Sequence, residues 1–178
     1  AVTLADVDTA DGGIRVAAGG TIIAADVRSL TDDDGNDIEL TTSAGDILLG
    51  TVDAGPLAGD VALDSAGIIA MLPGGRVTAD LLTADSVGDQ TLTTTINSAD
   101  LSVSAAGGIA VNESDAITLL DVDTANGPIA VVAGGTITAA DVRSLTDNDA
   151  NDIALTANGG GDIVLGIVNA RDAGDVTL

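Results

Sequence analysis

The chain contains a long internal duplication, and this constrains its fold more than any other feature. Residues 6–40 recur as residues 121–155, an offset of 115, with 27 of the 35 paired positions identical. The match extends from 6–63 to 121–178. Within each copy, shorter phrases of the form Gly-Asp/Gly-Ile/Val-x-Leu/Val are repeated. Because a short repeated unit cannot close a globular core alone, it must bury its apolar face against the next unit. The duplication therefore predicts one continuous solenoid over residues 1–178.

Short segments of alternating apolar and polar residues predict β-strands along the whole chain. In residues 38–40 (IEL) and 153–155 (IAL), the first and third side chains share one face and the middle side chain takes the other. No segment has the apolar spacing of an amphipathic helix, and 23 glycines interrupt the sequence. Crossovers between parallel strands are overwhelmingly right-handed. We therefore expect an all-β fold, a right-handed parallel β-helix.

Alignment of the repeated phrases gives about eight coils. The expected coil starts are Ile14, Ile38, Val61, Leu92, Ile109, Ile129, Ile153 and Val176. The interval from Val61 to Leu92 exceeds the others, and its surplus is expected to loop out near residues 83–90. Antiparallel hairpins are the competing topology, because Gly-Asp and Gly-Gly also mark hairpin turns. The parallel coil is favoured because equivalent residues recur once per coil and not in mirrored order.

The composition limits both the core and the chemistry. Phe, Tyr, Trp, Cys and His are all absent, although 46% of the residues are hydrophobic. The interior must therefore consist of Val, Ile, Leu and Ala, which suits a narrow tube better than a globule. The chain can form no disulfide, no thiolate zinc site and no Ser-His or Cys-His catalytic pair.

The charge limits the partners and the location. The chain has 28 acidic residues, five Arg and no Lys, for a formal net charge of −23. Nucleic acids and anionic membrane surfaces are therefore poor partners. No apolar run approaches the roughly 20 residues needed to cross a bilayer, so a membrane-embedded protein is not expected. The charge suits an extracellular or cell-surface location in saline or calcium-containing surroundings, where screening reduces the repulsion. The cytoplasm of a halophile would suit it as well.

The first and last residues read as open strands in the middle of a coil. Val2 to Leu4 and Val176 to Leu178 have the strand pattern but no capping segment. Exposed strand edges recruit further strands. We therefore expect this chain to be an uncapped segment of a longer repeat protein, which continues in tandem or stacks end to end.

Two acidic segments are candidate cation sites. Asp32, Asp34 and Asn36 alternate within residues 31–37, and the pattern recurs in residues 146–152 as Asp147, Asp149 and Asn151. Alternating oxygen ligands suit a hard cation, so calcium is the one cofactor suggested. The EF-hand pattern is incomplete, because position six is Asp and not Gly and position twelve lacks Glu. The alternative is a solvated turn in which Asp and Asn bind backbone amides.

Catalysis is not expected. Paired aspartates such as Asp6 with Asp8, or Asp32 with Asp34, could serve a polysaccharide-active enzyme in principle. However, the chain has no aromatic residue on which a sugar could stack and no Lys to act as a base. Asp residues also recur where strands begin, at Asp37, Asp46, Asp60, Asp152, Asp162 and Asp175. There they are expected to accept hydrogen bonds from nearby amides.

The segments GDILLGTVDAGPLAGDVAL (45–63) and GDIVLGIVNARDAGDVTL (161–178) resemble repeats of bacterial surface proteins of the filamentous haemagglutinin and autotransporter adhesin type. The resemblance lies in the texture of the repeats and includes no catalytic motif. It implies a secreted β-helix that acts as a stalk or fibre in adhesion or surface coating, with a glycan or a host-cell surface as the partner. The alternative function is a binding module whose outward Thr, Ser and Asp rows take glycan, calcium or ice.

Overall fold

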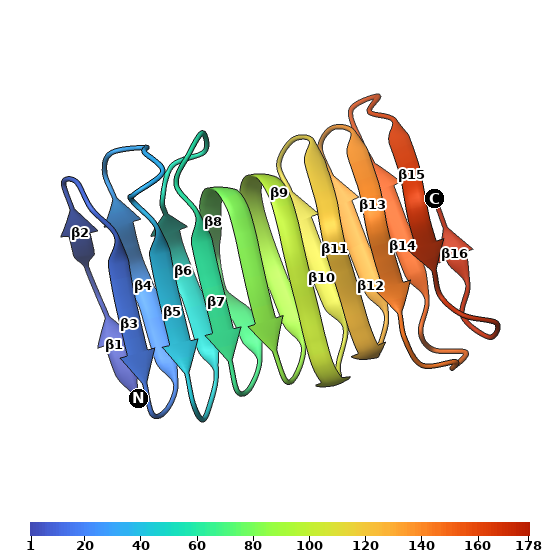
Figure 1. Cartoon of the computed structure of the whole chain (residues 1–178), viewed down its shortest axis with the longest axis horizontal. Coiled ribbons are helices and arrows are strands. Elements are labelled where there is room, and N and C mark those ends of the chain that lie inside the picture. The colour runs from blue at the N-terminus through green and yellow to red at the C-terminus, as the bar shows by residue number, and fades with distance from the viewer.

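The computed structural model describes residues 1–178 and consists of sixteen strands with no helix (Figure 1). Every strand pairing is parallel, which confirms the predicted coil and excludes hairpins. The strands are β1 (Val2–Leu4), β2 (Val7–Thr9), β3 (Ile14–Ala18), β4 (Ile22–Ser29), β5 (Ile38–Thr42), β6 (Ile47–Asp53), β7 (Val61–Ser65), β8 (Ile69–Ser86), β9 (Gln90–Ala106), β10 (Ile109–Glu113), β11 (Ile117–Asn126), β12 (Ile129–Ala133), β13 (Ile137–Ser144), β14 (Ile153–Ala157), β15 (Ile163–Asn169) and β16 (Val176–Thr177).

Two parallel sheets form the walls of the solenoid. The rear sheet of Figure 1 has the order β1-β4-β6-β8-β9-β10-β12-β14-β16, so eight coils separate its first and last strands. The front sheet contains β3, β5, β7, the later parts of β8 and β9, and then β11, β13 and β15. The front strands run down and the rear strands run up as the chain advances from left to right (Figure 1). The coil is therefore right-handed, as parallel crossovers require.

Apolar side chains stack in register along the interior of both sheets. The inward row of the rear sheet is Val2, Ile22, Ile47, Ile69, Gln90, Ile109, Ile129, Ile153 and Val176. The corresponding row of the front sheet is Ile14, Ile38, Val61, Leu82, Ala99, Leu119, Ala139 and Leu165. Apart from Gln90 and the exposed Val2, Leu165 and Val176, these residues belong to a cluster of 36 buried residues that are all Ile, Val, Leu or Ala. The aromatic-free core expected from the composition is thus a narrow seam between two sheets.

The coil placement expected between Val61 and Ile109 was wrong. Val61 pairs with Leu82, whereas Leu92 pairs with Val111 in the other sheet. No surplus loops out near residues 83–90, because β8 extends through Ser86 and Gln90 is only 1% exposed. Gln90 occupies an inward position that Ile fills on both neighbouring coils, so a pattern based on apolar residues misses the strand start.

The two copies of the duplication lie half a coil apart. Leu119 is five coils beyond Ile14 in the front row. Ile129, the repeat counterpart of Ile14, is ten residues further along and lies in the rear row. A segment that forms the front sheet in the first copy therefore forms the rear sheet in the second. The long loops 30–37 and 54–60 accordingly project from the upper edge in Figure 1, and loops 145–152 and 170–175 from the lower edge.

Candidate binding surfaces

The acidic turns predicted to bind calcium are braced by buried asparagines. Asn36 and Asn151 are each 2% exposed. The side-chain amide of Asn36 donates to the carbonyl of Thr31 at 2.7 Å, and that of Asn151 donates to Thr146 at 2.8 Å. Asn36 Oδ1 also accepts the backbone N–H of Gly12 on the preceding coil. Each asparagine therefore stabilises its turn by a hydrogen bond from its buried side chain to the backbone, as expected of Asn in a solvated turn.

The first aspartate of each turn binds the neighbouring loop. The carboxylate of Asp32 accepts the backbone N–H groups of Leu57, Ala58 and Gly59 at 3.0, 2.8 and 3.3 Å. At the same place in the second copy, Asp147 accepts the N–H of Ala173 at 2.8 Å. These bonds join successive loops along each edge of the solenoid, so the carboxylates have a structural partner without a cation.

The remaining predicted ligands, Asp34 and Asp149, are exposed within the two turns. No group of three or more His, Cys, Asp or Glu side chains lies close enough together to hold a metal ion. The six predicted ligands are divided between opposite edges, and four of them already bind backbone groups. Calcium binding at Asp32, Asp34 and Asn36, or at Asp147, Asp149 and Asn151, stays a prediction.

Four of the six aspartates expected to accept amides where strands begin do so and link one coil to the next, whereas Asp162 and Asp175 accept no such bond. Asp37 Oδ1 accepts the backbone N–H of Asp60 at 3.1 Å, and Asp60 Oδ1 accepts that of Leu81 at 3.1 Å. The same contact is made by Asp46, Asp89 and Asp152. Because each bond satisfies an amide at a strand start, these carboxylates extend the backbone ladder into the turns.

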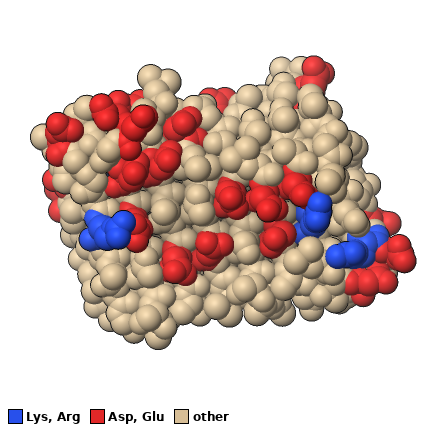
Figure 2. All heavy atoms as spheres, in the orientation of Figure 1, with Lys and Arg blue, Asp and Glu red and all other residues tan.

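The front sheet carries a band of acidic side chains across its outer face (Figure 2). Asp64, Asp85, Ser102 and Asp123 occupy one outward row, and Asp100 pairs with Asp121 in an adjacent row. Partial burial is the main cause that raises the pKa of Asp85, Asp100 and Asp123, and neighbouring carboxylates raise these values further. This band is a strongly anionic surface, but it lacks the convergence that a metal site requires.

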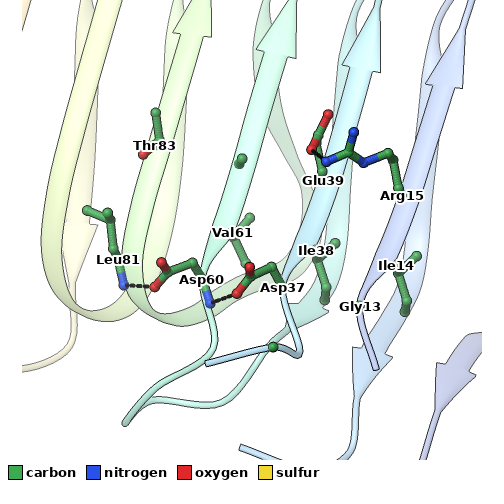
Figure 3. A pocket seen from close by; sticks show the side chains of 12 residues that line it. Gly13, Ile14, Arg15, Asp37, Ile38, Glu39, Asp60, Val61, Leu81 and Thr83 are labelled. Carbon is green, nitrogen blue, oxygen red and sulfur yellow. Dashed lines mark hydrogen bonds and ion pairs between the residues drawn. The ribbon is translucent and has the colours of Figure 1, made fainter. Parts of the chain in front are cut away.

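A groove of about 440 Å³ lies where the front strands β3, β5 and β7 and the front part of β8 begin (Figure 3). Arg15 and Glu39 from β3 and β5 form an ion pair of 2.6 Å at its rim. Asp37 and Asp60 line the opposite end, beside Leu81, whereas Thr83 lies in the same row of outward positions as Arg15 and Glu39. Burial raises the pKa of Asp60, and the hydrogen bond that its carboxylate accepts opposes this shift. The groove thus offers two carboxylates, one ion pair and one hydroxyl over an aliphatic floor.

The second copy lacks the polar rim of this groove. Ala130 and Ala154 stand where the first copy has Arg15 and Glu39, and Ala130 pairs with Ala154 as Arg15 pairs with Glu39. The polar groove is therefore a property of one copy and not of the repeat. Arg15 and Glu39 belong to no motif of metal ligands, so the sequence patterns did not single them out. Their spacing of 24 residues, about one coil, could have shown that they face each other across adjacent strands.

Comparisons with known proteins give no family, no curated relative and no solved structure that this chain matches. The structure has no helix of the length and apolarity needed to span a membrane.

Proposed function

We propose that this chain is a rigid structural segment of an extracellular bacterial surface or secreted filament protein, of the filamentous haemagglutinin and autotransporter adhesin type. In this role it acts as a spacer in adhesion or surface coating. The observation that carries the proposal is the uninterrupted pairing of strands along both sheets over eight coils. A continuous ladder of this kind resists bending because each coil is bound to its neighbours along its whole length.

The use of the acidic side chains supports a spacer role. The carboxylates of Asp32, Asp37 and Asp60 accept hydrogen bonds from backbone N–H groups of the next coil, so the accepting oxygens serve the scaffold and not a ligand-binding site. The contacts of Asp32 and Asp37 recur in the second copy at Asp147 and Asp152, on the opposite edge. Side chains that recur with the coil and bind its backbone contribute to the scaffold, whereas a binding function places distinctive groups at one point.

The spacer proposal is tested by exchange in the full-length protein. Residues 1–178 are replaced by an unrelated β-solenoid of eight coils, and surface display and cell attachment are measured. A spacer tolerates this exchange, because only its length and stiffness matter. Loss of attachment with unchanged display would overturn the proposal and favour a binding module.

A glycan-binding function is the second candidate, and the groove beside Arg15, Glu39 and Asp60 favours it. A charged rim over an aliphatic floor can bind the hydroxyl and amine groups of a sugar. A glycan array with the intact chain, repeated with Asp60→Asn and with Arg15→Ala, would detect such binding. A hit that both variants abolish supports the groove as the site. A hit that both retain excludes it.

A further inference from the structure

The front sheet has a hollow at Ala62 of β7. Ala62 points outward, and in the sheet it lies between Glu39 of β5 and Thr83 of β8, whose side chains are longer. Figure 3 shows Glu39 and Thr83 on the strands to either side of Val61. The groove of about 440 Å³ shares these three residues with a second groove of about 150 Å³ further along the strands. We call the two grooves together the furrow, which follows β7 from Asp60 to Asp64.

Carboxylates border the hollow on three sides. Asp60 and Asp64 lie two residues before and after Ala62, about 6.6 Å away along the strand, and share its outward face. Glu39 is its neighbour on β5, at the usual strand spacing of about 4.8 Å. On the side of β8, Asp85 pairs with Asp64. The hollow therefore lies among four acidic side chains.

The furrow has an excess of negative charge that its own cation does not neutralise. Five of the residues that line it are acidic and only one, Arg15, is basic. Arg15 is already paired with Glu39. Burial is the main cause that raises the pKa of Asp60 and of Asp85, and neighbouring carboxylates raise both values further. A cationic ligand would relieve the repulsion among these carboxylates.

Two of the carboxylates have an oxygen available for a ligand. Asp37 and Asp60 each accept one backbone N–H through Oδ1, at 3.1 Å in both cases. These bonds hold the two side chains in place and leave Oδ2 of each free to accept a further hydrogen bond. The structural use of Asp60 is therefore compatible with a role in binding.

The spacing of the carboxylates determines which cation fits. Calcium requires six or more oxygens that converge at about 2.4 Å on one point. No group of three or more acidic side chains in the chain lies close enough for this. An ammonium group on a saturated carbon skeleton fits the spacing better, because its three N–H groups donate to separate acceptors at about 2.8 Å. Its skeleton can pack on the aliphatic side chains of Ala62 and Leu81.

The comparison of the two copies singles out the larger groove. Seven of the 35 positions compared between residues 6–40 and 121–155 line it, and they include four of the eight differences. Gly13, Arg15, Gly35 and Glu39 of the first copy are replaced in the second by Pro128, Ala130, Ala150 and Ala154. Half of the differences thus fall on a fifth of the positions. This concentration is expected if the first copy has a site that the second lacks.

We propose that the furrow binds a primary ammonium group carried on a saturated carbon skeleton, as in an amino sugar or a linear diamine. The ammonium group donates to the carboxylates of Asp60 and Glu39, and the skeleton packs on Ala62 and Leu81. A neutral sugar leaves the charge of the furrow in place, and an acidic sugar adds to it. This inference deepens the glycan-binding candidate and rests on the groove being a binding site. It does not depend on the spacer function.

A titration of the intact chain followed by amide NMR spectra tests the proposal, because the spectra locate binding residue by residue. The probes are glucosamine, glucose and diaminobutane at about pH 6.5, where both amines are protonated. Glucosamine should shift the amide signals of Ala62 and Leu81 and bind at least about tenfold more tightly than glucose, because hydrogen bonds between charged groups are stronger than those of a hydroxyl. Diaminobutane separates the two sources of the amine. Its binding at the furrow shows that the ammonium group suffices, and binding of glucosamine alone identifies an amino sugar.

The outcomes separate this inference from the glycan-binding candidate. Equal binding of glucosamine and glucose at the furrow would overturn the ammonium inference and leave glycan binding in place. Binding of diaminobutane without either sugar would support the ammonium inference and remove glycan binding. If neither amine shifted the signals of the furrow, the inference would fail.

The decisive variant fills the hollow with an ammonium group of the chain itself. Ala62→Lys places this group among Asp60, Asp64 and Glu39, and it should abolish the binding of both amines. Ala17→Lys is the matched control, because it adds the same charge at an exposed outward position of β3 that lines neither groove. It should retain binding. Circular dichroism checks that both variants fold. Loss of binding in both would assign the attraction to net charge and would overturn the proposal.

A second pair of variants removes one charge each. Asp60→Asn keeps an oxygen that can accept the N–H of Leu81, and it should weaken amine binding about fivefold, as expected for the loss of one partly exposed ion pair. Asp175→Asn makes the same change at the repeat counterpart of Asp60 in the last coil. Its amine binding should equal that of the parent chain. Equal weakening by the two variants would contradict a site in the furrow.

Discussion

Residues 6–40 and 121–155 make the same local hydrogen bonds, although equivalent strands lie on opposite walls of the solenoid. Thr9 and Thr124 each donate to the carbonyl three residues ahead, at 2.6 Å in both copies. Thr31 and Thr146 each donate to a carbonyl of the preceding coil, also at 2.6 Å. The half-coil displacement leaves these local contacts intact because each depends only on its own turn and the adjacent coil.

The exteriors of the two copies differ in a way that the interiors do not. The first copy has Arg15 paired with Glu39 over a polar groove, and the second has Ala130 beside Ala154 with no charged side chain at either position. In a solenoid the exterior can change while the interior stays the same, because inward and outward side chains alternate along each strand. Its interior is set by stacking, and each wall is then free to acquire its own surface chemistry.

The largest effect is expected from a charge placed inside either copy. Ile38 and its repeat counterpart Ile153 are both fully buried. Ile38→Asp and Ile153→Asp should each cost more than about 3 kcal/mol of unfolding free energy, because an unpaired carboxylate enters an aliphatic interior. Urea unfolding followed by circular dichroism measures this cost.

The control for these variants is Ala17→Asp, which adds the same charge at an exposed outward position. It should change the unfolding free energy by less than about 0.5 kcal/mol. If Ile38→Asp and Ala17→Asp were equally stable, the assignment of the inner and outer faces would be wrong. If only one of the two isoleucine variants were destabilised, the equivalence of the two interiors would fail.

The buried asparagines should show the next largest effect. Asn36→Ala leaves the N–H of Gly12 without its acceptor, and Asn151→Ala removes donors to Thr146 and to Asn126 Oδ1. Each change should cost about 1–3 kcal/mol, because buried polar partners lose their bonds. Thermal unfolding of both variants sharpens the comparison of the copies. Similar losses are expected, and a negligible loss in either would mean that its turn does not depend on the asparagine.

The solenoid was predictable because its signals are local and repeated. Strand alternation, glycine turns and the parallel order of equivalent residues all concern adjacent coils, and the pairing of Ile14, Ile38 and Val61 followed directly from them. The structural use of Asp37 and Asp60 was also predictable, since an aspartate at a strand start has amides within reach.

The half-coil displacement was not predictable in the same way. Sequence identity between copies suggested that equivalent residues share a face, but the short coils between Leu82 and Leu119 shift the phase. These coils are hard to recognise because they contain inward polar residues. The side-chain NH2 group of Gln90 donates to the carbonyls of Ala84 and Ser102 inside the core, whereas its Oε1 has no partner.

Removal of the loop-binding aspartate should destabilise the first copy more than the second. Asp32 accepts amides of Leu57, Ala58 and Gly59, whereas Asp147 accepts only that of Ala173. Asp32→Ala should cost about 1–2 kcal/mol and Asp147→Ala less than about 1 kcal/mol, because exposed hydrogen bonds contribute modestly and their number differs. Thermal unfolding with and without millimolar calcium measures both effects. Equal losses would contradict the asymmetry, and stabilisation by calcium that Asp32→Ala abolishes would establish the predicted cation site.

The smallest expected effect is the pH dependence of stability that arises from Glu113, in the segment between the two copies. Glu113 lies inside the solenoid, where its carboxylate accepts the backbone N–H groups of Ile96 and Ser114. Burial raises its pKa above the ordinary value of 4.5, and the hydrogen bonds from backbone amides oppose the shift only in part. A raised carboxyl pKa in the folded state means that protonation favours folding. This stabilisation is complete below the unfolded-state pKa and is lost as the pH rises through the folded-state value.

The chain should therefore melt at a higher temperature near pH 5 than near pH 7, and the raised pKa values of Asp85, Asp100 and Asp123 act in the same direction. Glu113→Gln cannot ionise and should reduce this difference, whereas Glu39→Gln, on the exposed groove rim, should leave it unchanged. Thermal unfolding across this pH range decides the matter. An equal pH dependence in the parent chain and in Glu113→Gln would assign the effect to the outer carboxylates alone. The buried glutamate would then serve only to satisfy Ile96 and Ser114, where β10 ends and β9 continues.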